Sequence, residues 1–292
     1  MITHINVTQP YNWAMVQAFL ARRAIAGVET CGPLSYARYF DERPFYSEYT
    51  CLESALPSSW FCATYDPDLA RFTVELRLHS QDCADAVLAN ITRVLDAHQD
   101  MPVINKALLN AGFTPKDLTH GIRLPATWSP FEALVRAIVG QQISVTGAVN
   151  ILNRWVGDIR SDEPVTGISA STTALQQLHF PHPHEIAAFD TSSLPMPKAR
   201  QQTLNVAGTF AQNNALSTVD NVQALLALKG IGPWTVNYVL MRGLSAPDVF
   251  LHNDLVVKNQ LKHLASFSPI SPELASPWQS YVCIQLWEHA NT

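Results

Sequence analysis

The residues best suited to chemistry lie between positions 222 and 255, where a glycine turn is followed by an acid. The turn Lys229-Gly-Ile-Gly232 follows a short apolar segment, and Pro233 stands where proline favours the first turn of a new helix. Two glycines around one apolar residue let backbone amides approach another molecule closely, and amides at a helix start suit a phosphate oxygen. An ordinary helix-turn-helix uses the same pattern, so the turn alone leaves both interpretations open.

An aspartate follows this turn after 22 residues. Asp254 comes directly after the apolar run Val249–Leu251 and opens another amphipathic segment, which predicts a place at a helix start beside the turn. A carboxylate in such a place can stabilise positive charge that develops on a bound molecule. The alternative is a plain helix N-cap, for which Asn253 or Asp254 would serve.

Helical periodicity dominates the elements that must position these residues. Apolar spacings of three and four predict helices over 131–140, 141–156, 203–210, 222–228, 235–244 and 251–264. In the first hundred residues, period-two alternation predicts a strand over 72–79, with helices over 13–24 and 83–97 and short strands and turns over 36–64. The sequence therefore predicts a small α+β unit followed by a mainly helical region.

Composition limits the class of protein. The 292 residues are 47% hydrophobic, enough for a sizeable core, and about 150 residues per domain suggests two domains. Only 15% of residues are charged and the net charge is −5, which excludes a protein that binds nucleic acid over its whole surface. However, residues 195–265 carry 6 basic and 3 acidic groups and residues 121–160 carry 4 and 2. Either these small counts are noise, or an acidic body has one basic face.

Neither a metal cluster nor a membrane anchor is predicted. The five cysteines form no C-x-x-C pair, so we expect reduced, mostly buried thiols. His179, His182 and His184 flank two prolines in an extended arrangement, and a solvated loop is favoured over a metal site. The apolar run over 13–21 precedes Arg22 instead of following a basic region, which does not fit a secretory signal. We therefore expect a cytoplasmic protein, associated with the nucleoid in a bacterium.

Three further stretches share their order and spacing with one family. They are Pro10-Tyr-Asn-Trp13 with 19–22 and 28–38, Gly121-Ile-Arg-Leu-Pro125 with 131–145, and the C-terminal stretch from Trp278 to Trp287. With the turn and the acid, the chain resembles, over nearly its whole length, the DNA-3-methyladenine glycosylase II family, the alkylation-repair branch of the helix-hairpin-helix glycosylases. The resemblance implies an α+β fold. An N-terminal antiparallel α+β domain is followed in the sequence by a helix-hairpin-helix core of two helical domains.

The same resemblance implies three domains and a set of partners. The expected boundaries are 1–99 for the α+β domain, 129–246 for a central helical domain with the hairpin at 226–243, and 100–128 with 247–292 for a helical domain that closes the cleft. The implied partner is double-stranded DNA that contains alkylated bases such as 3-methyladenine and 7-methylguanine. We expect a monomer, because one asymmetric lesion needs one active site, and no required cofactor.

Site roles follow by position in the family motifs. Asp254 matches the catalytic aspartate, and Trp234, Tyr238 and Trp287 match aromatic residues that receive the flipped base; core packing is the alternative for these rings. The other matches concern DNA binding. Gln142 matches the wedge that fills the gap in the duplex, and the hairpin that contacts DNA matches Gly230, Ile231 and Gly232. The ligands of a structural Na⁺ or K⁺ match the backbone carbonyls of Leu226, Leu228 and Ile231.

The chain departs from the family pattern at the rim of the implied pocket. Gln142 replaces a leucine, Leu255 replaces a tyrosine, and His252-Asn253 replaces Pro-Asp. Bifunctional relatives carry a Schiff-base lysine where this chain has Trp234, so a monofunctional hydrolase of the N-glycosidic bond is expected. Two alternatives stay open at this stage: a non-catalytic helix-hairpin-helix DNA-binding module, and a glycosylase for oxidised bases with lyase activity.

Overall fold

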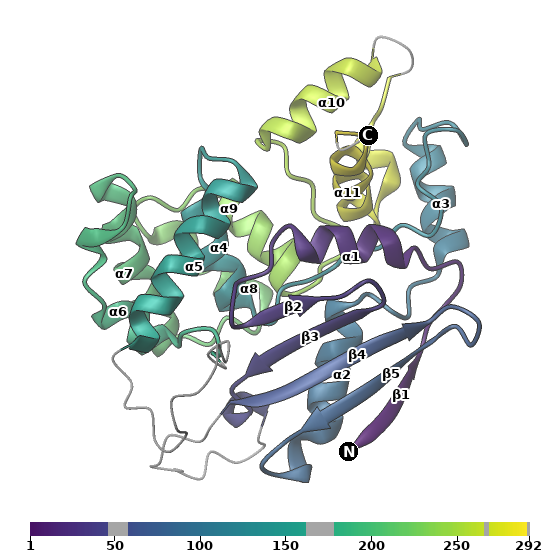
Figure 1. Ribbon diagram of the computed structural model, residues 1–292. Coiled ribbons are helices and arrows are strands. Elements are labelled where there is room, and N and C mark those ends of the chain that lie inside the picture. Colours follow the sequence, from purple (N-terminus) through teal and green to yellow (C-terminus); the bar gives the residue numbers. More distant parts are fainter. Residues whose placement is uncertain (46–57, 162–177, 266–268, 291–292) are drawn as a thin grey trace. The chain divides into compact units, whose positions relative to one another are not determined.

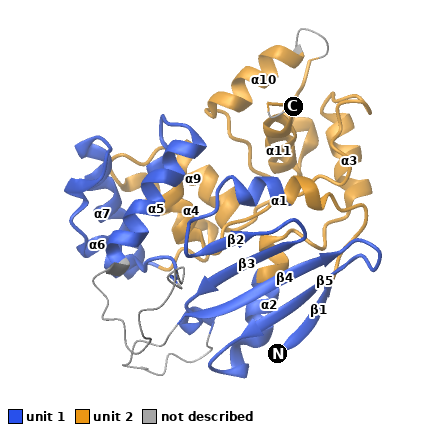
Figure 2. Ribbon diagram, in the orientation of Figure 1, with its two compact units in different colours: residues 1–5, 17–90, 138–214 blue, residues 6–16, 91–137, 215–292 orange. Residues whose placement is uncertain are grey.

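The computed structural model describes residues 1–45, 58–161, 178–265 and 269–290 (Figure 1). The described chain groups into two compact units, shown in different colours in Figure 2. The first unit contains residues 1–5, 17–90 and 138–214, and the second contains residues 6–16, 91–137 and 215–292. Each unit combines segments that are far apart in the sequence, and each is described by itself.

A five-stranded sheet forms the body of the first unit. Its strands are β1 (Ile2–Asn6), β2 (Glu29–Cys31), β3 (Ser35–Phe40), β4 (Ser59–Asp66) and β5 (Arg71–Arg77), in the order β1-β5-β4-β3-β2. The pairs β2-β3, β3-β4 and β4-β5 are antiparallel. The strand predicted over 72–79 is confirmed as β5 (71–77), since Phe72, Val74 and Leu76 are buried and Thr73 and Glu75 between them are not. One face of the strand therefore packs into the core, as the alternation predicts.

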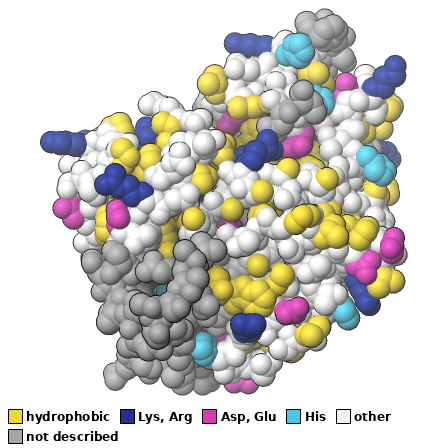
Figure 3. All heavy atoms as spheres, in the orientation of Figure 1, with side chains coloured by type: hydrophobic (Ala, Val, Ile, Leu, Met, Phe, Trp, Pro, Cys, Tyr) yellow, Lys and Arg dark blue, Asp and Glu magenta, His cyan; other side chains and the backbone are white. Residues whose placement is uncertain are grey.

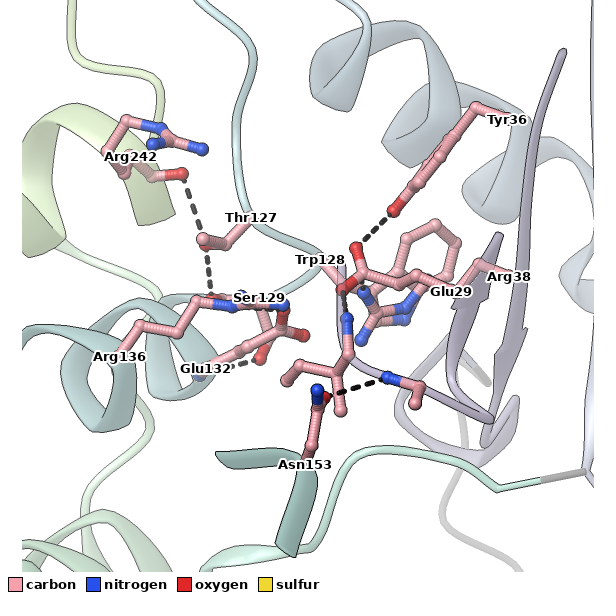
Figure 4. A network of polar contacts seen from close by, with 12 residues as sticks. Glu29, Tyr36, Arg38, Thr127, Trp128, Ser129, Glu132, Arg136, Asn153 and Arg242 are labelled. Atoms are coloured by element: carbon pink, nitrogen blue, oxygen red, sulfur yellow. Dashed lines mark hydrogen bonds and ion pairs between the residues drawn. The ribbon is translucent and has the colours of Figure 1, made fainter. Parts of the chain in front are cut away.

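A buried polar network lies at the β2 edge of this sheet. Glu29 accepts a hydrogen bond from Tyr36 at 2.7 Å and pairs with Arg38 at 3.1 Å, and both carboxylate and guanidinium are nearly inaccessible to solvent. Figure 4 shows these side chains and Asn153, whose Oδ1 accepts the N–H of Ala26 at 2.9 Å. Since Asn153 belongs to α5 (Val145–Ser161), this bond joins the helix to the loop that leads into β2.

Helices make up most of the rest. The α-helices not yet given are α1 (Trp13–Ala21), α2 (Ala84–Val94), α3 (Met101–Asn110), α4 (Pro130–Gly140), α6 (Pro183–Ala188), α7 (Lys198–Asn213), α8 (Val219–Gln223), α9 (Pro233–Tyr238), α10 (Leu255–Ala265) and α11 (Gln279–His289). Short 3-10 turns cover Arg43–Phe45, Gln81–Cys83, Thr191–Ser193, Ala224–Ala227 and Pro272–Ala275. In Figure 1, α11 lies beside α10 and α3, with which it packs in the second unit.

The α+β fold class is confirmed, and four of the predicted helices differ in detail, one of which, predicted over 251–264, begins at Leu255 as α10. The helix predicted from residue 141 begins at Val145, because Gln142 has a φ of +60° that an α-helix does not accept. The segment 222–228 divides into the end of α8 and a 3-10 turn. The segment 235–244 divides into α9 and a π turn over Val239–Gly243, in which Leu244 donates to the carbonyl of Val239, five residues back.

An ionisable network holds the core of the second unit. Arg123 is fully buried and donates to the backbone carbonyls of Thr8, Pro10 and Gln99. Next to it, Asp96 accepts hydrogen bonds from the Leu124 amide at 2.7 Å and the Tyr281 hydroxyl at 2.8 Å. Burial raises the pKa of Asp96 to about 6, although both hydrogen bonds and Arg123 act in the opposite direction.

We expect Asp96 to make stability depend on pH. Its pKa in the folded state lies above the unfolded value, so its favourable contribution is full only below about pH 4 and is lost as the pH rises through 6. A difference of two pKa units corresponds to about 3 kcal/mol at most. Denaturant unfolding between pH 4.5 and 8 should show that Asp96→Asn becomes more stable relative to the parent protein as the pH rises. A pH-independent difference between the two proteins would contradict this assignment.

Candidate active site

Asp254 stands at the first turn of α10 and is half-buried. Its Oδ1 accepts the backbone N–H of Val257 at 3.0 Å, so the carboxylate caps the helix. The same oxygen accepts the indole N–H of Trp287 at 3.2 Å, and Oδ2 accepts the indole N–H of Trp234 at 3.2 Å. The N-cap interpretation is therefore correct but incomplete, because a plain cap does not need two tryptophan donors from two other helices.

One face of α9 supplies the first of these donors. Trp234, Asn237 and Tyr238 are three and four residues apart, which places them on the same side of the helix. The rings of Trp234 and Tyr238 lie with centroids 5.4 Å apart and planes inclined by 31°. Asn237 donates to the carbonyl of Phe250 at 3.3 Å, which ties the segment before Asp254 to this helix.

One face of α11 supplies the second donor, and sequence reasoning missed two residues on it. Ser280, Cys283 and Trp287 are again three and four residues apart. Ser280 Oγ accepts the N–H of Val249 at 3.1 Å, and Cys283 Sγ accepts the N–H of Leu251 at 3.3 Å. Burial raises the pKa of Cys283 to about 12, so the sulfur stays a thiol. The face that presents Trp287 therefore also anchors the segment that leads to Asp254. The helical spacing of Ser280, Cys283 and Trp287 is the sequence pattern that could have indicated this shared face.

The two glycines of the hairpin before α9 have different structural roles. Gly230 has a φ of +90°, a conformation that disfavours any side chain, and Ile231 is buried with its N–H bonded to the carbonyl of Leu228 at 3.1 Å. Gly232 has an ordinary φ of −111°, and a Cβ atom placed on it would have no heavy atom of the chain within 4 Å. The turn thus requires Gly230 for its shape, whereas Gly232 keeps the start of α9 open to an approaching molecule.

The far end of the hairpin is fixed by an arginine that the sequence did not reveal. Arg93 donates to the Gly243 carbonyl at 3.0 Å and Ser245 Oγ at 3.1 Å, and to the carbonyls of Thr127 at 2.8 Å and Trp128 at 3.1 Å. A Cβ atom on Gly243 would lie 2.7 Å from Cα of Pro130, so the backbones meet without room for a side chain. These contacts fix the π turn against the start of α4.

A second set of bonds reinforces the same junction. Thr127 donates both its backbone N–H and its hydroxyl to the carbonyl of Arg242, at 2.8 and 3.2 Å, as Figure 4 shows for the hydroxyl. On α4, Glu132 and Arg136 form an ion pair at 2.7 Å with both side chains largely buried. The loop before α4 is therefore bonded to the hairpin on one side and leads directly into a rigid helix on the other.

Gln142 belongs to the other compact unit, in the turn between α4 and α5. It is exposed and holds a positive φ of 60°, and the neighbouring side chains of Ile143 and Val145 are also exposed, at 40% and 43%. Asp254, Trp234, Tyr238, Trp287 and the hairpin residues all lie in the second unit. The structure thus groups the predicted catalytic, aromatic and hairpin residues in one unit and describes the predicted wedge in the other.

The basic face expected from the sequence is smaller than the counts suggest. Among the six basic residues between 195 and 265, Arg200 and Arg242 are buried, at 9% and 2% exposure. Lys229, Lys258 and Lys262 are exposed in the second unit, and Lys198 in the first. On the face drawn in Figure 3, Lys and Arg side chains stand apart from one another. Between residues 195 and 265, the exposed basic charge is therefore four separate lysines.

The geometry in the second unit is suited to stabilising a cation. Two indole N–H groups and a helix start orient one carboxylate, and electron-rich rings lie on both helices that contact it. A positively charged ring can stack on such faces, with about 0.5–2 kcal/mol of attraction that depends on desolvation. A fixed carboxylate stabilises positive charge that develops close to it during a reaction.

Comparison with known proteins decides the family. A family model described as the AlkA N-terminal domain matches residues 3–129. DNA-3-methyladenine glycosylase 2 of Escherichia coli is 31% identical over 304 aligned positions, which cover 97% of this chain and 95% of that protein. The chain belongs to the DNA-3-methyladenine glycosylase 2 family. The family resemblance inferred from the motifs is thereby confirmed.

Solved structures of this fold include enzymes with different substrates. A 3-methyladenine DNA glycosylase from Archaeoglobus fulgidus superposes with a TM-score of 0.72 at 16% identity, over 99% of this chain and 98% of that one. An 8-oxoguanine glycosylase/lyase from Clostridium acetobutylicum superposes with a TM-score of 0.55 at 13% identity, over 90% and 99%. The shared fold therefore does not select the reaction, which depends on individual residues. Among the described residues, no helix is both long and apolar enough to cross a membrane.

Proposed function

We propose that this protein is a monofunctional DNA glycosylase that removes alkylated bases, such as 3-methyladenine and 7-methylguanine, from double-stranded DNA. It hydrolyses the N-glycosidic bond and leaves an abasic site for base excision repair. The observation that carries the proposal is the Asp254 carboxylate, oriented by the indole N–H groups of Trp234 and Trp287 in a member of this family.

The reaction starts with the rotation of the damaged base out of the duplex, which costs a few kcal/mol and least for a damaged base. An N3- or N7-alkylated purine carries a positive charge, so it stacks on the rings of Trp234, Tyr238 and Trp287. When the bond breaks, its electrons return to the base, which leaves neutral and needs no strong general acid. The positive charge passes to the sugar as an oxocarbenium ion, and Asp254 stabilises it until water adds at the same carbon.

The defining experiment is base release from methylated duplex DNA by the purified protein. We expect 3-methyladenine and 7-methylguanine in the product and an abasic site in the strand. Binding without release would support the alternative of a non-catalytic helix-hairpin-helix module. Borohydride added during turnover should trap no covalent adduct, because the start of α9 carries Trp234 where a Schiff-base enzyme needs an amine. A trapped adduct would replace the monofunctional proposal with the lyase alternative.

The hairpin is the proposed phosphate contact, and its two glycines allow a matched test. Gly232→Ala should fold normally, since its φ suits alanine and its Cβ enters open space, but the methyl group would obstruct a phosphate at the helix start. We expect DNA affinity to fall about tenfold, the loss of one charge-assisted hydrogen bond, with unchanged thermal stability.

Gly230→Ala serves as the contrast. Its φ of +90° makes alanine costly by about 1–2 kcal/mol, so thermal stability should fall in this variant. Equal DNA affinity of Gly232→Ala and the parent protein would place the phosphate elsewhere.

Two family roles complete the proposal. The carbonyl of Leu228 accepts one hydrogen bond from Ile231, and its second lone pair is compatible with a Na⁺ or K⁺ shared with the carbonyls of Leu226 and Ile231. Such an ion would add positive charge at the hairpin. Gln142, exposed in its turn, is the proposed wedge, and its amide could bond to the orphaned base. With few exposed lysines, binding should be modest and sensitive to salt.

A further inference from the structure

One of the three histidines that the sequence assigned to a solvated loop, His182, contacts an acid in the structure, and a second, His179, lies beside it. His179 and His182 precede α6, and Asp41 follows the end of β3; all three belong to the first compact unit. One possible ligand atom from each residue lies within 4.8 Å of the other two. His179 and His182 lie in a loop, as expected, but are only partly exposed, whereas His184 is exposed and belongs to the first turn of α6.

The contacts in this cluster are direct. His182 Nε2 lies 2.8 Å from Oδ2 of Asp41, with side-chain exposures of 20% and 9%. The rings of His179 and His182 have centroids 5.1 Å apart. Ser58 Oγ lies 3.1 Å from Nδ1 of His179, so a metal ion would use Nε2 of this ring.

Two imidazoles and one carboxylate form a donor set that Zn²⁺ prefers. With bonds of about 2.0–2.1 Å, a tetrahedral ion holds its ligands about 3.3 Å apart. The spacing in this cluster runs from 2.8 Å for a hydrogen-bonded pair to at most 4.8 Å, so side-chain adjustments of about 1 Å would be enough. Three protein ligands leave the fourth position to water.

Arg43 supplies the positive charge in the absence of a metal. Its guanidinium Nη2 lies 2.7 Å from Oδ2 of Asp41 and 3.3 Å from Nε2 of His182, which is the space an ion would use. The side chain is 34% exposed and has a long flexible stem, so it can turn out to solvent. A bound ion and the guanidinium would therefore compete for the same carboxylate.

We propose that Asp41, His179 and His182 form a Zn²⁺ site that Arg43 closes when no metal is bound. Binding there would join the end of β3 to the start of α6, two segments far apart in the sequence, and it lies outside the residues assigned to base release. The site would act as a structural clamp within the first unit.

The test is a titration of metal-stripped protein, in which ZnCl₂ is followed by calorimetry and CoCl₂ by visible absorption. We expect one equivalent to bind, a tetrahedral Co²⁺ spectrum, and a rise in melting temperature with Zn²⁺. Asp41→Asn and His182→Ala should each lower the affinity by about 100-fold, because each removes a direct ligand. Arg43→Gln should raise it by about tenfold, because it removes the competing cation.

His184→Ala is the matched control. His184 stacks on His182 with ring centroids 5.6 Å apart but lies outside the ligand set, so its loss should leave the affinity unchanged. Circular dichroism checks that each variant is folded. Absence of saturable binding to the parent protein, or equal affinities of the parent, Asp41→Asn and His182→Ala, would overturn the proposal. Weaker binding by Arg43→Gln would overturn the proposed competition.

Discussion

Asp254→Asn should lower the rate of 3-methyladenine release by at least about 100-fold, the loss expected when a fixed electrostatic partner of the transition state is removed. Asparagine has the same shape, caps helices as well as aspartate does, and can still accept the N–H of Val257. The substitution therefore removes the negative charge and the acceptor for one indole, while the start of α10 keeps its structure.

Three measurements separate the catalytic role from the cap. Single-turnover release on methylated DNA should fall, affinity for the same DNA should hold, and the free energy of unfolding should change by less than about 1 kcal/mol. Asp248→Asn is the matched control, because it neutralises an exposed carboxylate of the same loop, bonded to Ser276 and Gln279. Release at the parent rate by Asp254→Asn would reduce Asp254 to a helix cap.

Arg93→Met should lower the free energy of unfolding by about 1–3 kcal/mol, the usual cost of leaving buried acceptors without their hydrogen-bond donor. Methionine fills similar space but donates no hydrogen bond, so the carbonyls of Gly243, Thr127 and Trp128 lose a charged donor. Base release should fall as well, since the hairpin end is no longer fixed against the start of α4.

Chemical denaturation with a single-turnover assay measures both effects. Lys106→Met removes one positive charge at an exposed position of α3 and should change stability by less than about 0.5 kcal/mol. Equal stabilities of the two variants would show that the four acceptors of Arg93 are satisfied without it. Loss of base release at unchanged stability would instead give Arg93 a direct part in the site.

Local sequence patterns, such as apolar periodicity, predicted the helices and strands and the residues at their ends. The alternation at Phe72 and Val74 is a property of neighbours in the sequence, and β5 has the predicted buried face. Asp254 was predictable because it opens an amphipathic segment, and the structure places it there as a cap. Trp234 and Tyr238 follow the glycine turn at helical spacing, and their rings lie on one face of α9.

Long-range partners were not predictable in this way. Arg93 meets acceptors 34 to 152 residues away, and no periodicity within α2 indicates them. Asp41 and His182 belong to segments with no common pattern, so the histidines were assigned to solvent. Ser280 and Cys283 share a helical face with Trp287, but only the position of the Val249–Leu251 backbone shows what that face binds. Side-chain recognition across the chain depends on tertiary packing, which composition and spacing do not specify.

The π turn at the end of α9 lets one helix meet two orientation requirements, one for its aromatic face and one for the contact of Gly243 with Pro130. A π turn contains one residue more than an α-turn, so each residue beyond it is set back by about 100° around the helix axis relative to a regular α-helix of the same residues. Trp234 keeps the angular phase that directs its indole to Asp254, while Gly243 takes the phase that brings it against Pro130. If the same residues formed a regular α-helix, Arg242 would take the place of Gly243 against Pro130, where there is no room for a side chain. The length of this turn, as much as its sequence, thus sets the register between the aromatic face and the scaffold.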